Sequence, residues 1–142
     1  MPLVSTYNYS INAKGRINFP SKFLAVLGNK FYLTIGLDGC LSAYSEENFD
    51  KLAELIDNGP EGDRIMLKRY LFGNACEVEA DAQGRIIIPQ RLREYAKLES
   101  KVVVLGVSNK VEIWAEEKWN EISALGDDTA DKLKQLMIKN NI

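Results

Sequence analysis

The chain has 142 residues, of which 46% are hydrophobic and 27% are charged, and its formal net charge is −2. This length suits one domain with a core of its own, and this balance is typical of a soluble globular protein. There is no histidine and there are only two cysteines, so histidine-dependent nucleophiles and the usual zinc sites are excluded. We expect Cys40 and Cys76 to be small buried residues in a reducing compartment, and we expect no metal and no cofactor.

No segment is expected to enter a membrane or a secretory pathway. The longest apolar stretch, residues 102–107, is far shorter than a membrane span. Residues 1–6 lack the charged start and the long apolar block of a secretory signal. We therefore expect a cytoplasmic protein without a membrane partner.

Charge is segregated along the chain. Residues 1–37 carry +4 and residues 64–101 carry +3, whereas residues 38–63 carry −7 and residues 102–142 carry −2. A chain of this kind can present one basic face to a polyanion although its net charge is negative. We expect the acidic run from Glu46 to Asp63 to form a solvated helix face or one side of a subunit contact.

The first half of the chain predicts a strand, a turn, a helix, a hairpin and a second helix. Alternating apolar residues at 7, 9 and 11 predict a strand with one buried face, and Gly15 marks a tight turn after it. The elements that follow are a strand at 17–19, a helix that Pro20 begins and Gly28 ends, a hairpin of 31–35 and 40–44 that turns at Asp38-Gly39, and a helix after Ser45.

The second half predicts the same succession. Residues 57–60 break the chain, and residues 63–72 predict a linking helix. The elements that follow are a strand at 76–80, a turn at Gly84, a strand at 86–88, a helix over 92–96 after Pro89, a hairpin of 102–107 and 111–114, and a helix from 116. A last helix, over 128–138, carries its apolar residues on one side and could pack on the body or on another chain.

The two halves contain copies of one segment. Residues 10–20 read SINAKGRINFP and residues 79–89 read EADAQGRIIIP. Asn12 thereby corresponds to Asp81, and Gly-Arg-Ile and Pro recur in the same places. After a shift of one residue the match continues from Gly36 and Gly106 to Phe49 and Trp119. A match sustained over about forty positions predicts two structural repeats.

These repeats predict how the chain is organised. We expect a first repeat over residues 1–57, a linking loop and helix over 58–74, a second repeat over 75–125 and a helical tail over 126–142, all in one compact domain. A unit of about fifty residues is marginal alone, so the repeats should share one core with pseudo-twofold symmetry. We expect the repeat-equivalent aromatic residues to lie in this core rather than to stack on bases: Tyr44, Phe49, Trp114 and Trp119.

Two Asp-x-x-Gly-Arg-type turns, each followed by a strand and a proline and spaced by about seventy residues, closely resemble the MraZ family. The resemblance covers nearly the whole chain and extends to the AbrB-like swapped-hairpin transcription factors. It implies an α+β fold in which two pseudo-symmetric repeats form one small swapped-hairpin β-barrel flanked by short helices. It also implies a nucleoid-associated, ring-like homo-oligomer that binds repeated DNA sites in the promoter of the cell-division and cell-wall gene cluster.

One residue departs from the family pattern. The family carries Asp in both turns, whereas this chain has Asn12 in the first. Asn can still bond to the backbone two residues on, so we expect the turn to survive. Because Asn is uncharged, an ion pair between this position and an arginine is not expected in the first copy. The two copies are therefore not expected to be symmetric in this contact.

The turn arginines are the best candidates for contact with double-stranded DNA. An arginine at the exposed end of a turn can reach a phosphate or place its fork on guanine, and a β-ribbon fits the major groove. Alternatively, these arginines could be solvated or could bridge to an acid of the protein itself. The candidate DNA-binding residues are Arg16, Arg85, Lys14 and Gln83. Four residues that flank the motif are weaker candidates, for contacts with the DNA backbone: Asn18, Lys22, Arg91 and Arg93. The turn-forming residues are Asn12, Gly15, Asp81 and Gly84.

Two other classes of function compete with DNA binding. No phosphate-cradling loop, dinucleotide motif or nucleophile elbow is present, so we expect no enzyme and no small-molecule substrate. A protein-interaction scaffold or an antitoxin-like module remains the alternative to a DNA-binding regulator. If about three cations of a chain neutralise phosphates, log K falls with a slope of only about −2.7 against log salt. One chain alone would then bind weakly, which favours an oligomer on repeated sites.

Overall fold

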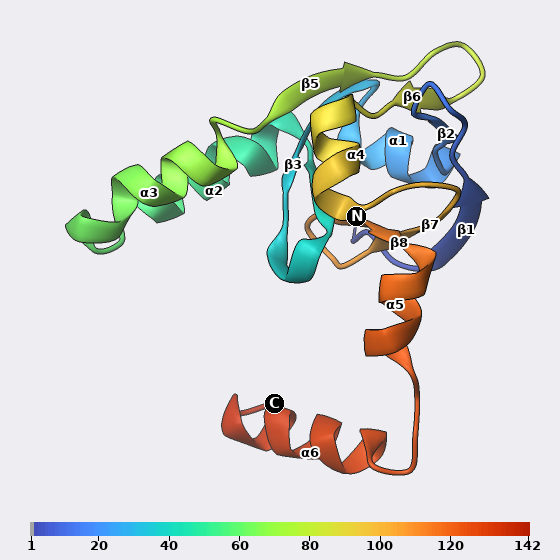
Figure 1. The fold of residues 1–142 in the computed structure, drawn as a ribbon. Coiled ribbons are helices and arrows are strands. Elements are labelled where there is room, and N and C mark those ends of the chain that lie inside the picture. The colour runs from blue at the N-terminus through green and yellow to red at the C-terminus, as the bar shows by residue number, and fades with distance from the viewer. Residues whose placement is uncertain (1) are drawn as a thin grey trace.

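The computed structural model describes residues 2–142, so the expected first repeat is seen from residue 2 onward. Figure 1 shows a small body of strands and short helices with two helical extensions. The elements are β1 (Thr6–Ser10), β2 (Arg16–Asn18), α1 (Ser21–Leu27), β3 (Lys30–Ile35), the 3₁₀ turn Leu37–Gly39, β4 (Leu41–Tyr44), α2 (Glu46–Asp57), α3 (Glu61–Leu71), β5 (Cys76–Glu79), β6 (Arg85–Ile87), α4 (Gln90–Ala96), β7 (Lys101–Gly106), β8 (Val111–Ala115), α5 (Glu116–Ser123) and α6 (Thr129–Lys139).

The strands of the two halves are exchanged in one antiparallel sheet. Its order is β1-β7-β8-β4-β3-β5, and β2 and β6 form a separate two-stranded ribbon. The first strand of each half pairs with the hairpin of the other half, β1 with β7 and β5 with β3. The two halves meet at the centre, where β4 pairs with β8 and Ser42 lies opposite Glu112. Corresponding strands of the two halves therefore occupy equivalent positions counted from the two edges of the sheet: β1 and β5, β7 and β3, and β8 and β4.

The α+β class is confirmed, but the closed barrel is wrong. Strands β1 and β5 end the sheet at opposite edges, and within residues 2–142 β2 and β6 pair only with each other. The turn after β1, like the turn after β5, redirects the chain into a strand of only three residues. These short strands form their own ladder and do not join the two edges of the sheet.

Both halves contribute to one hydrophobic core. It combines the sheet with the ribbon and with the inner faces of α1 and α4, including Phe23, Leu27, Leu92 and Ala96. On α4 the expected apolar stripe is shortened, because Tyr95 is 42% exposed and donates its hydroxyl to the carbonyl of Gly36. Burial of side chains from both halves in a single cluster makes each half dependent on the other.

The residues predicted to mark helix ends lie at helix ends in the structure. Pro20 and Pro89 stand immediately before α1 and α4. Gly28 ends α1 with a φ of 89°, which favours glycine. The Ser45 side chain accepts a hydrogen bond from the backbone N–H of Asn48 at the start of α2.

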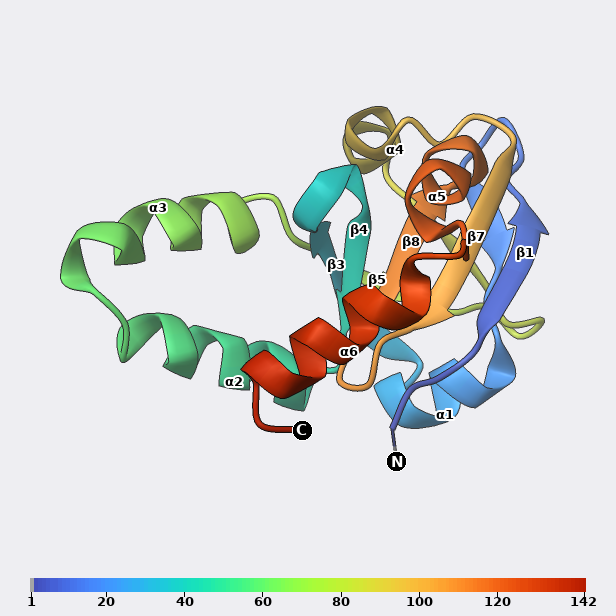
Figure 2. The same cartoon turned by 90° about the horizontal axis from the view of Figure 1, so that it is seen from below.

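Two helical extensions leave the body. Helices α2 and α3 form an arm that projects to one side in both views (Figures 1 and 2). Its base is fixed by Phe49 against Phe72, with ring centroids 4.5 Å apart, and by the Thr34 hydroxyl, which donates to the carbonyl of Leu71. Helix α6 lies beyond α5, and all of residues 130–142 are exposed. No helix within residues 2–142 is long and apolar enough to cross a membrane.

Candidate nucleic-acid interface

The two Gly-Arg turns have the same backbone geometry. The Oδ1 of Asn12 accepts from the backbone N–H groups of Lys14 (3.0 Å) and Arg16 (2.9 Å). The Oδ1 of Asp81 accepts in the same way from Gln83 and Arg85, both at 2.9 Å. An amide oxygen and a carboxylate oxygen therefore build the same turn.

Each turn is locked to the other half of the molecule. The carbonyl of Gly15 accepts from the N–H of Ile88 (2.8 Å), and the carbonyl of Gly84 accepts from the N–H of Phe19 (2.9 Å). Both glycines have positive φ, 83° and 76°. These crossed hydrogen bonds fix the position of one turn relative to the other.

The ribbon places both turn arginines on one outward face. In the β2–β6 ladder Arg16 lies opposite Ile87, Ile17 opposite Ile86 and Asn18 opposite Arg85. Ile17 and Ile86 are each 1% exposed and pack inward. Since successive side chains of a strand alternate between faces, the other four residues share the outer surface. We call this surface the ribbon face: Arg16, Asn18, Arg85 and Ile87.

The two arginines differ in their contacts within the protein. Arg85 donates from Nε to Oδ2 of Asp81 (2.9 Å) and from Nη2 to Oε1 of Gln83 (2.8 Å). The backbone N–H of Arg85, followed by its guanidinium and the N–H of Gln83, holds the pKa of Asp81 below its usual value. Within residues 2–142, no ion pair joins Arg16 to an acid.

Sequence reasoning missed two acids beside the ribbon face. Arg16 and Arg85 border a shallow hollow of about 280 Å³ together with Glu77 and Glu79. Both glutamates are exposed on β5, where they alternate with inward-facing residues. In the sequence, the alternation of Glu77 and Glu79 with apolar residues was the signal that could have identified them as outward-facing. The equivalent places on β1 hold the neutral Asn8 and Ser10.

The remaining candidates lie in three settings. Lys14 and Gln83 are exposed in the turns themselves. Lys22, on α1, borders a different hollow of about 430 Å³ with residues 2–5. Arg91 donates to the side-chain oxygen of Asn74. The ribbon face thus brings Arg16 and Arg85 together, with Lys14 and Gln83 in the turns at its two ends. Lys22 and Arg91 lie outside this group.

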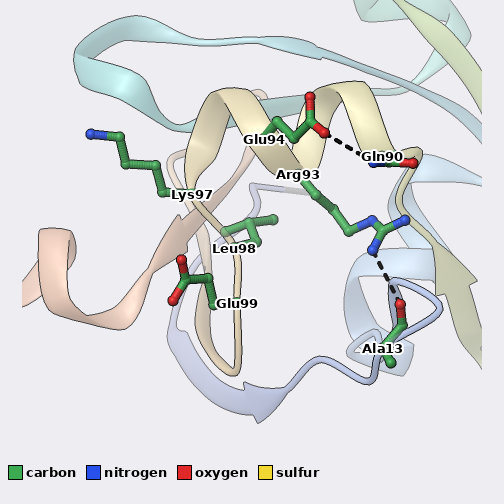
Figure 3. Close-up of a pocket in the computed structure, with 7 residues that line it drawn as sticks. All are labelled: Ala13, Gln90, Arg93, Glu94, Lys97, Leu98 and Glu99. Carbon is green, nitrogen blue, oxygen red and sulfur yellow. Dashed lines mark hydrogen bonds between the residues drawn. The ribbon is translucent and has the colours of Figure 1, made fainter.

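The side chain of Arg93 joins the two halves of the chain by hydrogen bonds. Its Nε donates to the carbonyl of Ile88 (2.9 Å), and its Nη1 donates to the carbonyl of Ala13 (3.4 Å). Figure 3 shows this side chain reaching from α4 to the first turn, beside an open hollow of about 510 Å³. Its guanidinium supports the turn that carries Arg16.

Residues outside the interface serve the core. Tyr44, Phe49 and Trp114 are buried, and Trp119 is half-buried against Trp114.

The two cysteines are free thiols, of which Cys40 is fully buried and Cys76 is half-buried. Burial, with a contribution from Glu112, raises the pKa of Cys40 to about 12. Among residues 2–142, no cluster of three or more potential ligands could hold a metal ion.

Comparison with known proteins shows which family the chain resembles. The family model described as "MraZ protein, putative antitoxin-like" matches residues 3–61 and 71–138. A protein of Acetivibrio thermocellus named transcriptional regulator MraZ is 46% identical over 133 residues, which cover 92% of this chain and 93% of the relative. Relatives of that name from Caldicellulosiruptor saccharolyticus and Caldanaerobacter subterraneus subsp. tengcongensis are 43% and 40% identical, over 95% and 99% of this chain and 96% and 99% of theirs. The chain therefore belongs to the MraZ family.

Proposed function

We propose that this protein is a transcriptional regulator that binds double-stranded DNA through the ribbon face, without catalysis. One observation carries the proposal: the arginines of both turns lie on the same outward surface of a two-stranded antiparallel ribbon. A ribbon of this kind fits the major groove, where arginine forks match the acceptors of guanine. The relatives named transcriptional regulators support the same function.

The local chemistry supports a division between anchoring and reading. Lys14 is exposed next to Arg16 and can bind a phosphate as a point charge. Ile87 is 51% exposed between the arginines and offers an apolar surface to a thymine methyl group. Ile17 and Ile86 anchor the ribbon from beneath, so the outer side chains are held on a rigid element. Lys22 and Arg91 are proposed only as outlying backbone contacts.

We further propose binding as a homo-oligomer to repeated promoter sites. The resemblance to the family suggests a ring and the promoter of the cell-division and cell-wall gene cluster, with the protein associated with the nucleoid. Exposed apolar side chains support self-association. They lie on α3, at Ile65, Met66, Leu67 and Tyr70, and on α6, at Leu133, Leu136, Met137 and Ile138. Linked chains on repeated sites gain avidity that one chain with a few cationic contacts lacks.

Gel-shift titration tests the proposal. The probes are a duplex from the promoter of the division and cell-wall genes of the same genome and a scrambled duplex of equal length. Arg16→Ala and Arg85→Ala should each weaken binding to the promoter duplex, and the double variant should abolish it, because the outward guanidinium groups are lost. Folded and assembled variants that keep wild-type affinity would overturn the proposal.

An antitoxin-like interaction module is the second candidate, since the family description names that likeness. Such a module would bind a partner polypeptide through surfaces other than the ribbon face. Partner binding would then survive Arg16→Ala and Arg85→Ala, and the wild-type protein would not distinguish the promoter duplex from the scrambled one.

A further inference from the structure

The two turns hold their arginines differently, and an inference that rests on the proposed function follows from this. In the second turn Asp81 and Gln83 both accept hydrogen bonds from the Arg85 guanidinium, at 2.9 and 2.8 Å. In the first turn the matching places hold Asn12 and Lys14. We propose that Arg85 reads a guanine, that Arg16 binds a phosphate of the same duplex, and that Asp81 and Gln83 are positioning residues for Arg85.

Within residues 2–142, the hydrogen bonds of the protein engage Nε and Nη2 of Arg85 and leave Nη1 free. A guanidinium has five N–H donors, so three remain, two on Nη1 and one on Nη2. We propose that Nη1 and the remaining hydrogen of Nη2 provide the paired donors that match O6 and N7 of guanine in the major groove.

Restraint also favours base reading over phosphate binding at Arg85. Two contacts fix the guanidinium before DNA arrives, so less side-chain freedom is lost on binding and the fork has one orientation. Discrimination between bases depends on such a fixed orientation. A phosphate, in contrast, presents acceptors in several directions and can be bound by a side chain that adapts.

The local charges point the same way. The first turn carries the cations Lys14 and Arg16 without a carboxylate, whereas in the second turn Asp81 neutralises Arg85. Glu77 and Glu79 border the hollow that Arg16 and Arg85 share, so their negative charge does not distinguish the two arginines. The difference in charge lies within the turns, where Lys14 adds a cation beside Arg16 and Asp81 neutralises Arg85. The first turn is therefore the more attractive to the DNA backbone, and the second depends more on hydrogen-bond geometry.

Four variants of the full-length protein separate the two roles. Asp81→Asn gives the second turn the residue that already builds the first turn, and Gln83→Ala removes the other contact without changing charge. Arg16→Ala removes the proposed phosphate contact. The double variant Asn12→Asp with Lys14→Gln gives the first turn the residues found at these places in the second. Fluorescence anisotropy would measure dissociation constants for the promoter duplex and the scrambled duplex over a range of salt concentrations.

The expected readout is the ratio of the two dissociation constants, which the fraction of folded protein does not affect. Asp81→Asn and Gln83→Ala should each reduce this preference for the promoter duplex by roughly fivefold to a hundredfold, the range provided by one bidentate base contact. Asp81→Asn should also tighten binding to the scrambled duplex, because a carboxylate is lost.

Arg16→Ala should weaken binding to both duplexes by the same factor and reduce the salt slope by about 0.9, the change for one phosphate contact. The Asn12→Asp, Lys14→Gln variant should likewise weaken both. An unchanged ratio in Asp81→Asn and Gln83→Ala, or a reduced ratio in Arg16→Ala, overturns the assignment of roles and leaves the proposed function standing. A wild-type protein that shows no preference for the promoter duplex overturns the proposed function itself.

Discussion

At the scale of single residues, the two turn glycines are conformationally alike but sterically different. Both have positive φ. A Cβ added at Gly15 would lie 2.6 Å from Nε of Arg93 and 2.6 Å from the carbonyl oxygen of Ile88. For a Cβ added at Gly84, the nearest atom among residues 2–142 would be Cδ1 of Leu24, at 3.7 Å. The first turn is therefore held tightly against α4, and the second has room around it.

This difference predicts unequal costs of Gly→Ala substitution. Gly84→Ala should lower the free energy of unfolding by roughly 1–2 kcal/mol, the cost of a left-handed conformation for an L-residue. Gly15→Ala should cost more, because the new methyl group also displaces Arg93 and the Ile88 carbonyl. Urea denaturation measures both, and equal losses would contradict the packing described for the first turn.

Cys40 predicts a pH dependence of stability. Burial raises its pKa from 9.0 to about 12 in the folded protein, so the folded state favours the neutral thiol. Its contribution is fully present below pH 9 and is lost as the pH rises toward 12, because only the unfolded chain then ionises. In urea denaturation the stability difference between wild type and Cys40→Ala should be smaller at pH 10 than at pH 7. A constant difference would contradict this.

At the scale of elements, the ribbon has one structural face and one exposed face. Ile86 points into the core and its neighbour Ile87 points outward. Ile86→Ala should lower the free energy of unfolding by about 2–5 kcal/mol, as for other large-to-small core changes. Ile87→Ala should change it by no more than about 0.5 kcal/mol and should instead weaken DNA binding. Equal destabilisation by the two would contradict the assigned faces.

Local elements could be predicted from the sequence because each depends on nearby residues. Ser45, Pro20 and Gly28 mark helix ends by their own chemistry, and the linking helix expected over 63–72 is α3, Glu61–Leu71. The Asn12 substitution also indicated which arginine would lack an ion pair.

Features that depend on pairing between distant strands could not be predicted. Alternating apolar residues indicate a buried face but not the neighbouring strand, so they do not show that β1 and β5 are open edges of the sheet. The alignment of Gly36 with Gly106 is one residue out of step with the sheet, where Tyr32 lies opposite Tyr44 and Val103 opposite Trp114. Glu77 and Glu79 border the same hollow as Arg16 because β2 pairs with β6, which is another pairing of distant strands.

At the scale of the whole molecule, the body is compact, whereas α3 and α6 project from it and contain no buried residue (Figures 1 and 2). The apolar side of α6 includes Leu133, 55% exposed, and Leu136, 59% exposed. An amphipathic helix with an exposed apolar side is stabilised by a partner surface.

This exposure predicts that self-association depends on α6. Leu133→Asp with Leu136→Asp should reduce the assembly mass in sedimentation velocity and weaken binding to repeated sites more than to a single site, because avidity is lost. Gln135→Asp, on the opposite side of the helix, is the matched control and should leave the mass unchanged. A wild-type mass in the double variant would exclude α6 from the subunit contact.

Thiol protection tests directly whether the ribbon face is the proposed DNA-binding surface. In a Cys76→Ala background, Ile87→Cys places a thiol on the ribbon face, and Leu55→Cys places one on α2, where Leu55 is 70% exposed. Saturating promoter duplex should slow alkylation of the thiol at position 87 in proportion to the bound fraction and leave position 55 unaffected. Unchanged alkylation at position 87 while the duplex is bound would contradict the ribbon face as the DNA-binding surface.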